Sequence, residues 1–408
     1  MLRSFIHLLT RDGAILFTTR IVRLFAYGFL SVVLALYLTQ VGLTQTEIGA
    51  LLTLTILGDA GISLGITLAA DRLGRRRMLL LGAALMGFAG IVFALTGNLV
   101  WLTLAAIIGV LSPSGGEIGP FLSIEQAALA QIVPNDQRTR IFAWYNLVGS
   151  FATATGALGS GSLAQFLQAQ DWTPLASYRM IVIGYAALGI LLALLFAQLS
   201  PHIEAPRRGR GTPSGLHRSR NIVLKLSALF ALDAFAGGLL VQTFVAYWFQ
   251  SRWGVAPGIL GSIFFAANLL AGISALFAAR IAARIGLINT MVFTHIPSNL
   301  LLILVPLMPT LPLAIFVLLA RFAISQMDVP ARQSYTMAVV APDERSAASG
   351  ITTIARSIGA AWSPAITGAL FSVSLFALPF FLCGGLKIIY DVTLWQSFRT
   401  LKPPEETQ

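Results

Sequence analysis

Apolar runs of about 20 residues recur along the whole chain, separated by short polar or charged stretches. Each run is long enough to cross the hydrocarbon core of a bilayer as an α-helix. The runs are continuous and do not alternate every second residue, so they predict helices and not the strands of a barrel. Turn residues divide them into twelve predicted spans: 14–38, 45–69, 78–97, 100–131, 141–166, 178–199, 222–249, 257–283, 288–308, 311–337, 346–371 and 373–395.

Composition supports this pattern. Of the 408 residues, 56% are hydrophobic and 11% are charged, whereas soluble domains carry about 25% charged residues. No soluble core could bury so many apolar runs, and no segment between the spans is large enough for an ATPase domain. We therefore predict an all-α integral membrane protein.

The basic residues predict the orientation. Most Lys and Arg lie in the termini and in the loops on the same side of the predicted bundle, whereas only Arg179 and Arg252 lie in loops on the other side. Positive loops stay in the cytoplasm, so both termini are expected there, in a multi-pass protein of the cell inner (plasma) membrane. Topology and lipid headgroups explain the net charge of +11, and no nucleic-acid partner is expected. The stretch MLRSFIHLLTR at the start is either a short interfacial helix or a frayed tail.

A polar stretch divides the chain near its middle. Its sequence, SPHIEAPRRGRGTPSGLHRSR at residues 200–220, is rich in Pro, Gly and Arg, which is typical of a linker. We expect an N-terminal six-helix bundle at 1–199, a cytoplasmic basic linker at 200–221, and a C-terminal six-helix bundle with a short cytoplasmic tail at 222–408.

The two halves share short sequences in the same order. ADRLG at 70–74 corresponds to AARIG at 282–286, AGIS at 60–63 recurs at 271–274, and VPNDQR at 133–138 resembles APDERS at 341–346. Each match alone is weak, but the constant order and near-constant spacing indicate a duplicated six-helix unit.

Twelve spans, a 6+6 repeat, a basic central linker and a D-R-x-G-R-R loop between spans 2 and 3 together resemble the major facilitator superfamily. The resemblance covers essentially the whole chain and implies two pseudo-symmetric six-helix bundles. Thr67 stands where the family's first Gly is expected, and five residues match the loop motif: Asp71, Arg72, Gly74, Arg75 and Arg76.

Asp71 is the unusual member of this loop. It lies at the cytoplasmic end of helix 2, where the helix dipole disfavours an acid, so it needs a compensating partner. The resemblance implies a conformational latch between the halves, in which Asp71 meets the N-terminus of helix 11 and nearby arginines. Gly74 allows the tight turn. A topology signal alone would explain the arginines but not the acid.

Among the ionisable residues within the predicted spans, five acids and five arginines stand out, and each costs at least a few kcal/mol unless it meets a partner or a wet cavity. Most lie in helices 1, 4, 7 and 10, which line the central cavity in the resembling family. Arg20 is one of the ten, and the other nine are the candidate substrate and proton-coupling residues: Arg23, Asp59, Glu117, Glu125, Asp233, Arg321, Asp328, Arg332 and Arg356.

Spacing predicts some of their partners. Arg23 and Asp59 each lie about 15 positions from the turn between helices 1 and 2, so we predict that they pair. Arg321, Asp328 and Arg332 lie on one stripe of helix 10. Asp328 and Arg332 could pair there, which would leave Arg321 in need of another partner.

Proton coupling requires a buried carboxylate that changes its environment. Glu117, Asp233 or Asp328 is the expected coupling carboxylate, because all three fall near mid-depth. Arginines on its own stripe should keep Asp328 ionised. Glu117 and Asp233 have no basic neighbour within one helical turn and are the expected proton carriers. Glu117 also lies in SPSGGEIGPF, whose Pro and Gly residues indicate either a discontinuous helix near the substrate or a kink for packing.

These observations favour secondary active transport of a small organic solute by alternating access, with proton-coupled export as the main hypothesis. Uptake or facilitated diffusion of an anionic or zwitterionic solute is the alternative, with Arg23, Arg321 and Arg356 as counter-charges. A receptor or scaffold would not need so many charges within the spans. The expected partners are substrate, protons and the bilayer, and the expected state is a monomer.

Enzyme chemistry and bound cofactors are not expected. The single cysteine, Cys383, excludes a thiolate cluster, and the four scattered histidines give no close pair for a metal. No nucleophile–base spacing stands out. His295 is interpreted as a packing or interfacial residue.

Overall fold

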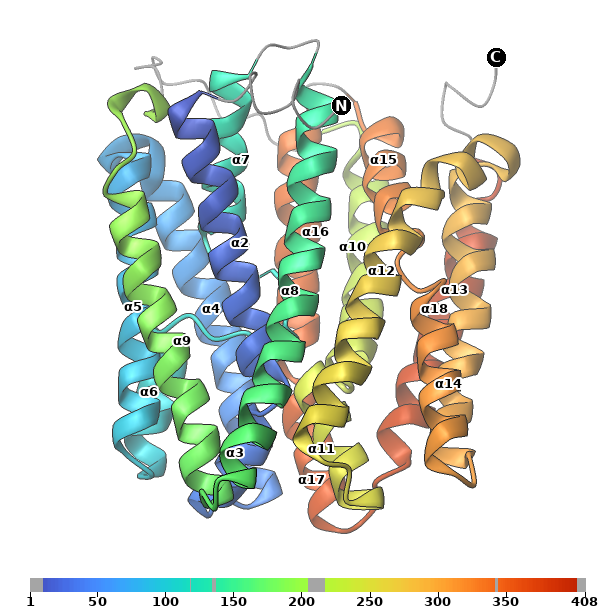
Figure 1. Cartoon of the computed structure of the whole chain (residues 1–408). Helices are drawn as coiled ribbons and strands as arrows, with labels where there is room; N and C mark the ends of the chain where they lie inside the picture. The colour runs from blue at the N-terminus through green and yellow to red at the C-terminus, as the bar shows by residue number, and fades with distance from the viewer. Residues whose placement is uncertain (1–9, 118, 134–136, 205–216, 342–343, 402–408) are drawn as a thin grey trace. The chain divides into compact units, whose positions relative to one another are not determined.

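The computed structural model describes residues 10–117, 119–133, 137–204, 217–341 and 344–401, and in these residues every regular element is a helix (Figure 1). Each of the twelve expected spans corresponds to one helix or to two consecutive helices. The possible N-terminal interfacial helix and most of the expected linker, 205–216, lie outside the described residues.

The helices form two compact units, the first made of Met1–Arg210 and Gln242–Phe265, the second of Gly211–Val241 and Ala266–Gln408. The second predicted half thus contributes Gln242–Phe265 to the first unit. The helices of the first unit are α2 (Arg11–Ser31), α3 (Leu34–Val41), α4 (Gln45–Leu73), α5 (Arg75–Leu95), α6 (Leu99–Ile108), α7 (Phe121–Ile132), α8 (Arg138–Ala169), α9 (Pro174–Phe196), η2 (Pro201–Ile203) and α11 (Gln242–Trp253).

Helix α12 (Pro257–Ile285) begins in the first unit, and its residues from Ala266 onward belong to the second. The remaining helices of the second unit are α10 (Arg220–Gly238), α13 (Leu287–Leu304), η3 (Val305–Leu307), α14 (Leu311–Phe322), α15 (Asp328–Val339), α16 (Arg345–Ala361), α17 (Ser363–Ser372) and α18 (Leu378–Phe398). Eight helical segments are long and apolar enough to cross a membrane, and α6 and α14 are shorter apolar helices.

Helix 4, by which we mean the fourth predicted span at 100–131, is interrupted, as its Pro and Gly residues suggest. Helix α6 ends at Ile108 and α7 begins at Phe121. Between them, Gly115 and Gly119 have φ values of 69° and 80°, which residues with a Cβ rarely adopt. Tyr185 donates a hydrogen bond to the carbonyl of Val110 at 2.6 Å, so a neighbouring helix satisfies part of the freed backbone.

Helix 10, the tenth predicted span at 311–337, is interrupted at the equivalent place of the repeat, between α14 and α15. Pro330 is the third residue of α15. It has no N–H, and its ring would clash with the carbonyl of Gln326 in a continuous helix. Within the break, the backbone N–H of Gln326 donates to Ser274 Oγ at 3.2 Å. Breaks of this kind expose backbone groups within a membrane protein only where other groups satisfy them.

Packing inside each unit is close. In the first unit α2 packs on α8 and α9, and α5 packs on α9; in the second, α10 packs on α16 and α13 on α18. Gly156 of α8 lies directly against the backbone of Phe25, and Gly359 of α16 lies against that of Ala231. A side chain at either glycine would separate the helices, as in other close helix contacts within membranes.

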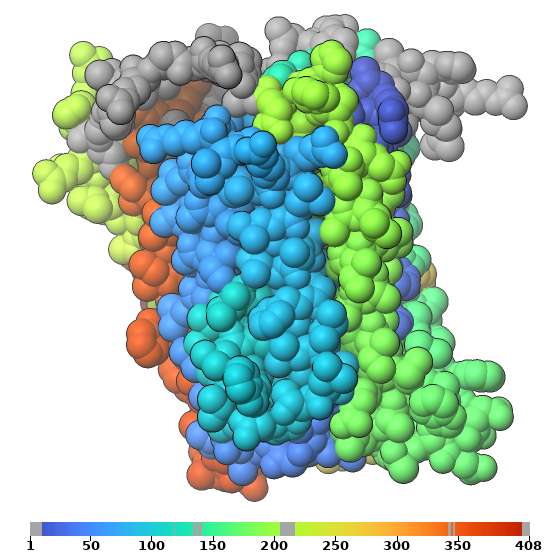
Figure 2. Space-filling model, turned by 90° about the vertical axis from the view of Figure 1, so that its left-hand side faces the viewer, coloured from blue at the N-terminus to red at the C-terminus, as the bar shows by residue number. Residues whose placement is uncertain are grey.

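Helices α5, α6 and α9 lie on one face of the first unit (Figure 2). Large hydrophobic residues are exposed along all three helices, among them Phe88, Trp101, Leu104, Ile183 and Ile190. Many exposed large hydrophobic side chains on neighbouring helices are typical of a surface that contacts lipid and not water.

Both ends of the expected linker are bound to the unit in which they lie. On the first side, Ser200 donates its N–H to Asp12 at 2.9 Å, and Glu204 accepts the N–H of Arg75 at 2.6 Å. On the second side, Glu344 accepts the N–H groups of three consecutive residues, His217, Arg218 and Ser219, at 2.6–2.8 Å.

The hydrogen bonds to Glu344 have a larger effect on the pKa of its carboxyl than burial has. Burial raises the pKa of this carboxyl, but the three backbone N–H donors lower it, to about 2. A lowered pKa stabilises the fold above the unfolded value of about 4.3 and loses that effect as the pH falls towards 2. Glu344 therefore stays ionised at physiological pH.

Candidate functional site

Four charged side chains gather in the first unit, three of them buried and the fourth, Glu117, 19% exposed. Arg20 and Arg23 lie on α2, Glu117 lies in the break of helix 4, and Glu125 lies on α7. Arg20 Nη1 lies 2.8 Å from Glu117 Oε2. Arg23 forms ion pairs with both Glu117 and Glu125, and the side chains of Arg23 and Glu125 are completely buried. Two cations and two anions thus balance one another.

Polar groups of neighbouring helices complete this cluster. Arg20 donates to the carbonyl of Tyr145 at 2.7 Å and to Asn146 Oδ1 at 3.2 Å. Glu125 accepts hydrogen bonds from the hydroxyls of Thr19 and Tyr145, and Arg20 lies 4.3 Å from the centre of the Tyr145 ring. Sequence reasoning missed Thr19, Tyr145 and Asn146, because polar uncharged residues within a span give only a weak signal.

The predicted pair of Arg23 and Asp59 is wrong. Arg23 binds the two glutamates, whereas Asp59 of α4 accepts a hydrogen bond from Ser63 Oγ at 3.2 Å and another from the backbone N–H of Gly119. The prediction rested on equal depth in two adjacent helices. It did not anticipate that the interrupted segment of helix 4 brings Glu117 to α2.

Five charged side chains form a second cluster, inside the second unit, which we call the Asp233 cluster. Asp233 of α10 lies 3.0 Å from Arg332 of α15, 3.0 Å from Arg356 of α16 and 2.6 Å from Lys387 of α18. Arg332 also lies 3.4 Å from Asp328, one turn before it in α15, so this predicted pair is confirmed. Four helices thus contribute three cations and two anions.

No basic residue lies within one helical turn of Glu117 or Asp233 along the chain, but other helices supply cations to both. Glu117 binds two arginines and Asp233 binds three cations, all from other helices. Sequence spacing reports only neighbours on the same helix, so it could not find these contacts. Lys387 was not among the predicted site residues, because it lies in a peripheral helix.

Arg321 has a different environment from the other buried arginines. It lies in the last turn of α14, next to the break of helix 10, and its guanidinium lies 4.7 Å from the centre of the Phe322 ring. Its Nε has no hydrogen-bond partner, and among the described residues Arg321 forms no ion pair. A buried guanidinium with an unsatisfied N–H can bind an anion at little additional cost in desolvation.

The residues of the loop motif bind their own unit. Asp71 Oδ1 lies 3.0 Å from Arg75 Nε, but the Asp71 side chain remains 68% exposed. Arg75 also donates to Gln131 and to the carbonyl of Ile203, while Arg76 donates to the carbonyl of Ala197. Gly74 has a φ of 105°, as expected for the tight turn. Arg72 is exposed.

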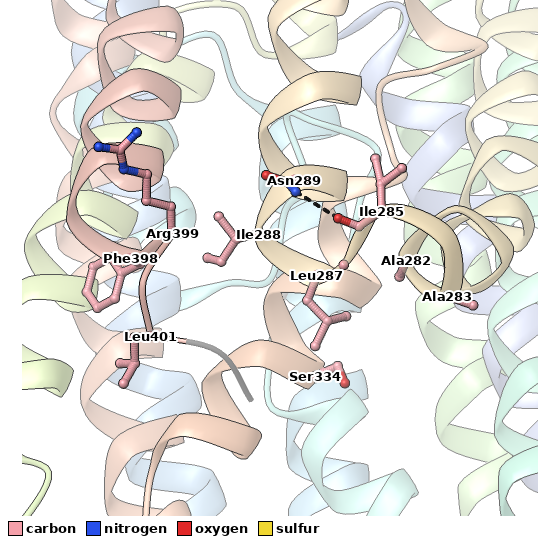
Figure 3. A pocket seen from close by; sticks show the side chains of 11 residues that line it. Ala282, Ala283, Ile285, Leu287, Ile288, Asn289, Ser334, Phe398, Arg399 and Leu401 are labelled. Atoms are coloured by element: carbon pink, nitrogen blue, oxygen red, sulfur yellow. Dashed lines mark hydrogen bonds between the residues drawn. The ribbon is translucent and has the colours of Figure 1, made fainter. Parts of the chain in front are cut away.

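A cavity of about 500 Å³ lies apart from these charges, inside the second unit (Figure 3). Its walls are the turn between α12 and α13, Ser334 of α15 and the end of α18 with Arg399 and Leu401. Asn289 donates to the carbonyl of Ile285 on its wall at 2.8 Å. None of the predicted site residues lines this cavity.

Metal ligation has no support in the described residues, which contain no group of three or more His, Cys, Asp or Glu that could hold an ion. Cys383 is a buried free thiol.

Known proteins similar to this chain are membrane transporters or uncharacterized membrane proteins. An uncharacterized membrane protein of Saccharomyces cerevisiae is 30% identical over 94% of this chain and 93% of its own length. The quinolone resistance protein NorA of Staphylococcus aureus is 25% identical over 88% of this chain and 90% of its own. The crystal structure of the nucleoside transporter NupG has a TM-score of 0.73, with 14% identity over 96% of this chain and 100% of that one.

The predicted resemblance is thereby confirmed. Residues 16–324 match the Major Facilitator Superfamily, and the solved transporter shares the all-helical fold over nearly the whole chain. The chain therefore belongs to the Major Facilitator Superfamily and is a multi-pass membrane transporter.

Proposed function

We propose that this transporter exports a small organic solute by alternating access in exchange for protons. The similarity to a quinolone resistance protein supports export, because removal from the cell is how a transporter confers resistance. The two clusters of buried charges support coupling, since charges are retained within a membrane protein chiefly where they serve ion or substrate pathways. Further parts of the proposal are a plasma-membrane location, cytoplasmic termini, a monomeric state and the absence of enzymatic activity.

The observation that carries the proposal is the environment of Asp59. It is the predicted site carboxylate that forms no ion pair in the described part of the chain, because its hydrogen bonds come from Ser63 and Gly119. A partly buried carboxylate without a cation exchanges its proton at lower cost than one held by arginines. We therefore assign proton carriage to Asp59 in place of Glu117 and Asp233.

Asp59 is also linked to the first cluster of charges, through the backbone of the interrupted segment of helix 4. Gly119 belongs to the interrupted segment of helix 4, two residues after Glu117, which holds Arg20 and Arg23. A proton on Asp59 removes the charge that attracts the N–H of Gly119 and so loosens this segment. Protonation and the arrangement of the first cluster are coupled in this way.

Asp59→Asn should abolish solute flux that is driven by a pH gradient but spare exchange between compartments of equal pH. The amide keeps the shape and accepts hydrogen bonds, but it cannot carry a proton. The measurement uses proteoliposomes with a fluoroquinolone as the probe.

Asp171→Asn is the matched control, because Asp171 is an exposed acid in the turn after α8 and asparagine tolerates its φ of 62°. Full proton-driven flux in Asp59→Asn would refute the assignment of Asp59. If the wild type moves a probe with no dependence on the pH gradient, facilitated diffusion replaces the proton-coupled function.

Uptake or facilitated diffusion of an anionic or zwitterionic solute is the second candidate function. Arg321 favours it, because its Nε is buried without a hydrogen-bond partner and its guanidinium forms no ion pair among the described residues. Competition of the proteoliposome flux by anionic, zwitterionic and cationic forms of one compound series distinguishes the two candidates. Under the alternative, Arg321→Gln should lose the preference for anions.

We further propose that Asp71, Arg72, Gly74, Arg75 and Arg76 form the conformational latch. Asp71→Asn should reduce transport several-fold and shift accessibility towards the inward-facing state, because the latch favours the outward-facing one. Binding of the fluoroquinolone in detergent should stay close to that of the wild type. The accessibility of single cysteines to a membrane-impermeant thiol reagent, in a Cys383→Ser background, measures the shift. Lost binding with unchanged accessibility would make Asp71 a ligand instead.

A further inference from the structure

A buried histidine and a buried aspartate meet between two helices outside the proposed site. His295 Nδ1 of α13 lies 2.9 Å from Asp391 Oδ1 of α18, and Asn299 Nδ2 donates to Asp391 Oδ2 at 3.1 Å. Asp391 and Asn299 are completely buried, and His295 is 5% exposed. His295 is thus more than the packing residue that its sequence context suggests.

Both carboxylate oxygens of Asp391 are bound by side chains that need not be charged. In the described part of the chain, no Lys or Arg forms an ion pair with Asp391. Lys387 is one turn away on the same helix, but its Nζ binds Asp233 at 2.6 Å. An ionised Asp391 beside a neutral imidazole is therefore a buried charge without a full counter-charge, which is costly.

The surroundings determine the charge balance. The charged or titratable groups on the helices around the pair include Asp233 of α10, Arg321 of α14, Asp328, Arg332 and Tyr335 of α15, Arg356 of α16, and Cys383, Lys387 and Tyr390 of α18. The Asp233 cluster has three cations and two anions. The five charges of this cluster and an ionised Asp391 together sum to zero.

We propose that His295 and Asp391 form a proton-binding site in the second unit, separate from Asp59. The unoccupied state is an ionised Asp391 that accepts a hydrogen bond from neutral His295. The occupied state adds one proton from water to the pair, held as imidazolium and carboxylate or as imidazole and carboxylic acid. No other bond forms or breaks.

Proton binding to the pair changes the electrostatic attraction that acts on Lys387. Residues four apart on a helix are neighbours, so Lys387 is attracted both by Asp391 and by Asp233. When the pair gains its proton, the attraction of Lys387 to Asp391 is offset, and Lys387 is held by Asp233 alone. The proton site is linked to the Asp233 cluster through this lysine. Its role in coupling rests on the proposed function, but its proton binding does not.

Infrared difference spectroscopy of the full-length protein in lipid nanodiscs, between acidic and alkaline pH and without substrate, tests the site directly. The wild type should show a histidine or carboxyl signal that titrates, and Asp391→Asn should lose it. His295→Gln should keep a carboxyl signal at a shifted frequency and a shifted midpoint, because Asp391 remains but has lost its imidazole. Asp59→Asn is the matched control and should retain the His295–Asp391 signal.

The outcomes separate this inference from the proposed function. If every titrating signal of the wild type persists in Asp391→Asn and in His295→Gln, the proton site does not exist. If Asp391→Asn does not fold, His295→Gln alone decides, and an unchanged titration in that variant refutes the site. A titrating signal at Asp391 in a protein without pH-driven flux would uphold the site and refute proton coupling.

Discussion

Asp233→Asn should lower the free energy of unfolding of the second unit by about 3–5 kcal/mol, the range for breaking a buried ion pair by removing one partner. Asp233 is 5% exposed and binds Arg332, Arg356 and Lys387. Its neutralisation leaves these three cations with Asp328, which contacts only Arg332. Unfolding in mixed micelles with increasing denaturing detergent measures the change.

The double variant Asp233→Asn with Lys387→Met is the informative comparison. It removes one charge of each sign and should be more stable than the single variant, because fewer cations remain unpaired. Asp171→Asn should unfold like the wild type. If Asp233→Asn also unfolds like the wild type, these contacts do not determine the stability of the unit.

Arg23→Met should produce a loss of similar size in the first unit, again about 3–5 kcal/mol. Arg23 and Glu125 are both completely buried, and Arg23 is the cation that binds Glu125. Without it, Glu125 keeps only the hydroxyls of Thr19 and Tyr145. Glu117 would be less affected, because Arg20 remains bound to it.

The same detergent titration measures this loss, and a second substitution tests its cause. Arg23→Met with Glu125→Gln should recover much of the stability, since the amide still accepts both hydroxyl hydrogen bonds and carries no charge. A double variant that is as unstable as the single one would assign the loss to packing around the Arg23 side chain. It would contradict the electrostatic explanation.

The fold was predictable because its cause lies within each segment. A membrane requires every backbone group to be satisfied locally, so the length of an apolar run predicts a helix without knowledge of its neighbours. The break of helix 4 was also visible, in Gly115, Gly119 and Pro120. That of helix 10 was not anticipated, although Pro330 is its local cause.

The partners of the buried charges were much less predictable. Asp328 and Arg332 are four residues apart on one helix, and their pairing could be read from the sequence. Arg23 pairs with residues about a hundred positions away, and Lys387 reaches Asp233 from another helix. Such contacts depend on how helices rotate and pack, which single-sequence periodicity does not contain.

Arg321 has a consequence for the electrical behaviour of the transporter. The other buried cations named in the second unit lie against a carboxylate, so the field across a membrane pulls oppositely on the two partners. Arg321 has no such compensation among the described residues. A full crossing of the membrane by one charge corresponds to about 2.3 kcal/mol per 100 mV. Any movement of this guanidinium along the membrane normal therefore makes the conformational equilibrium depend on voltage, and an inside-negative potential favours its displacement towards the cytoplasm.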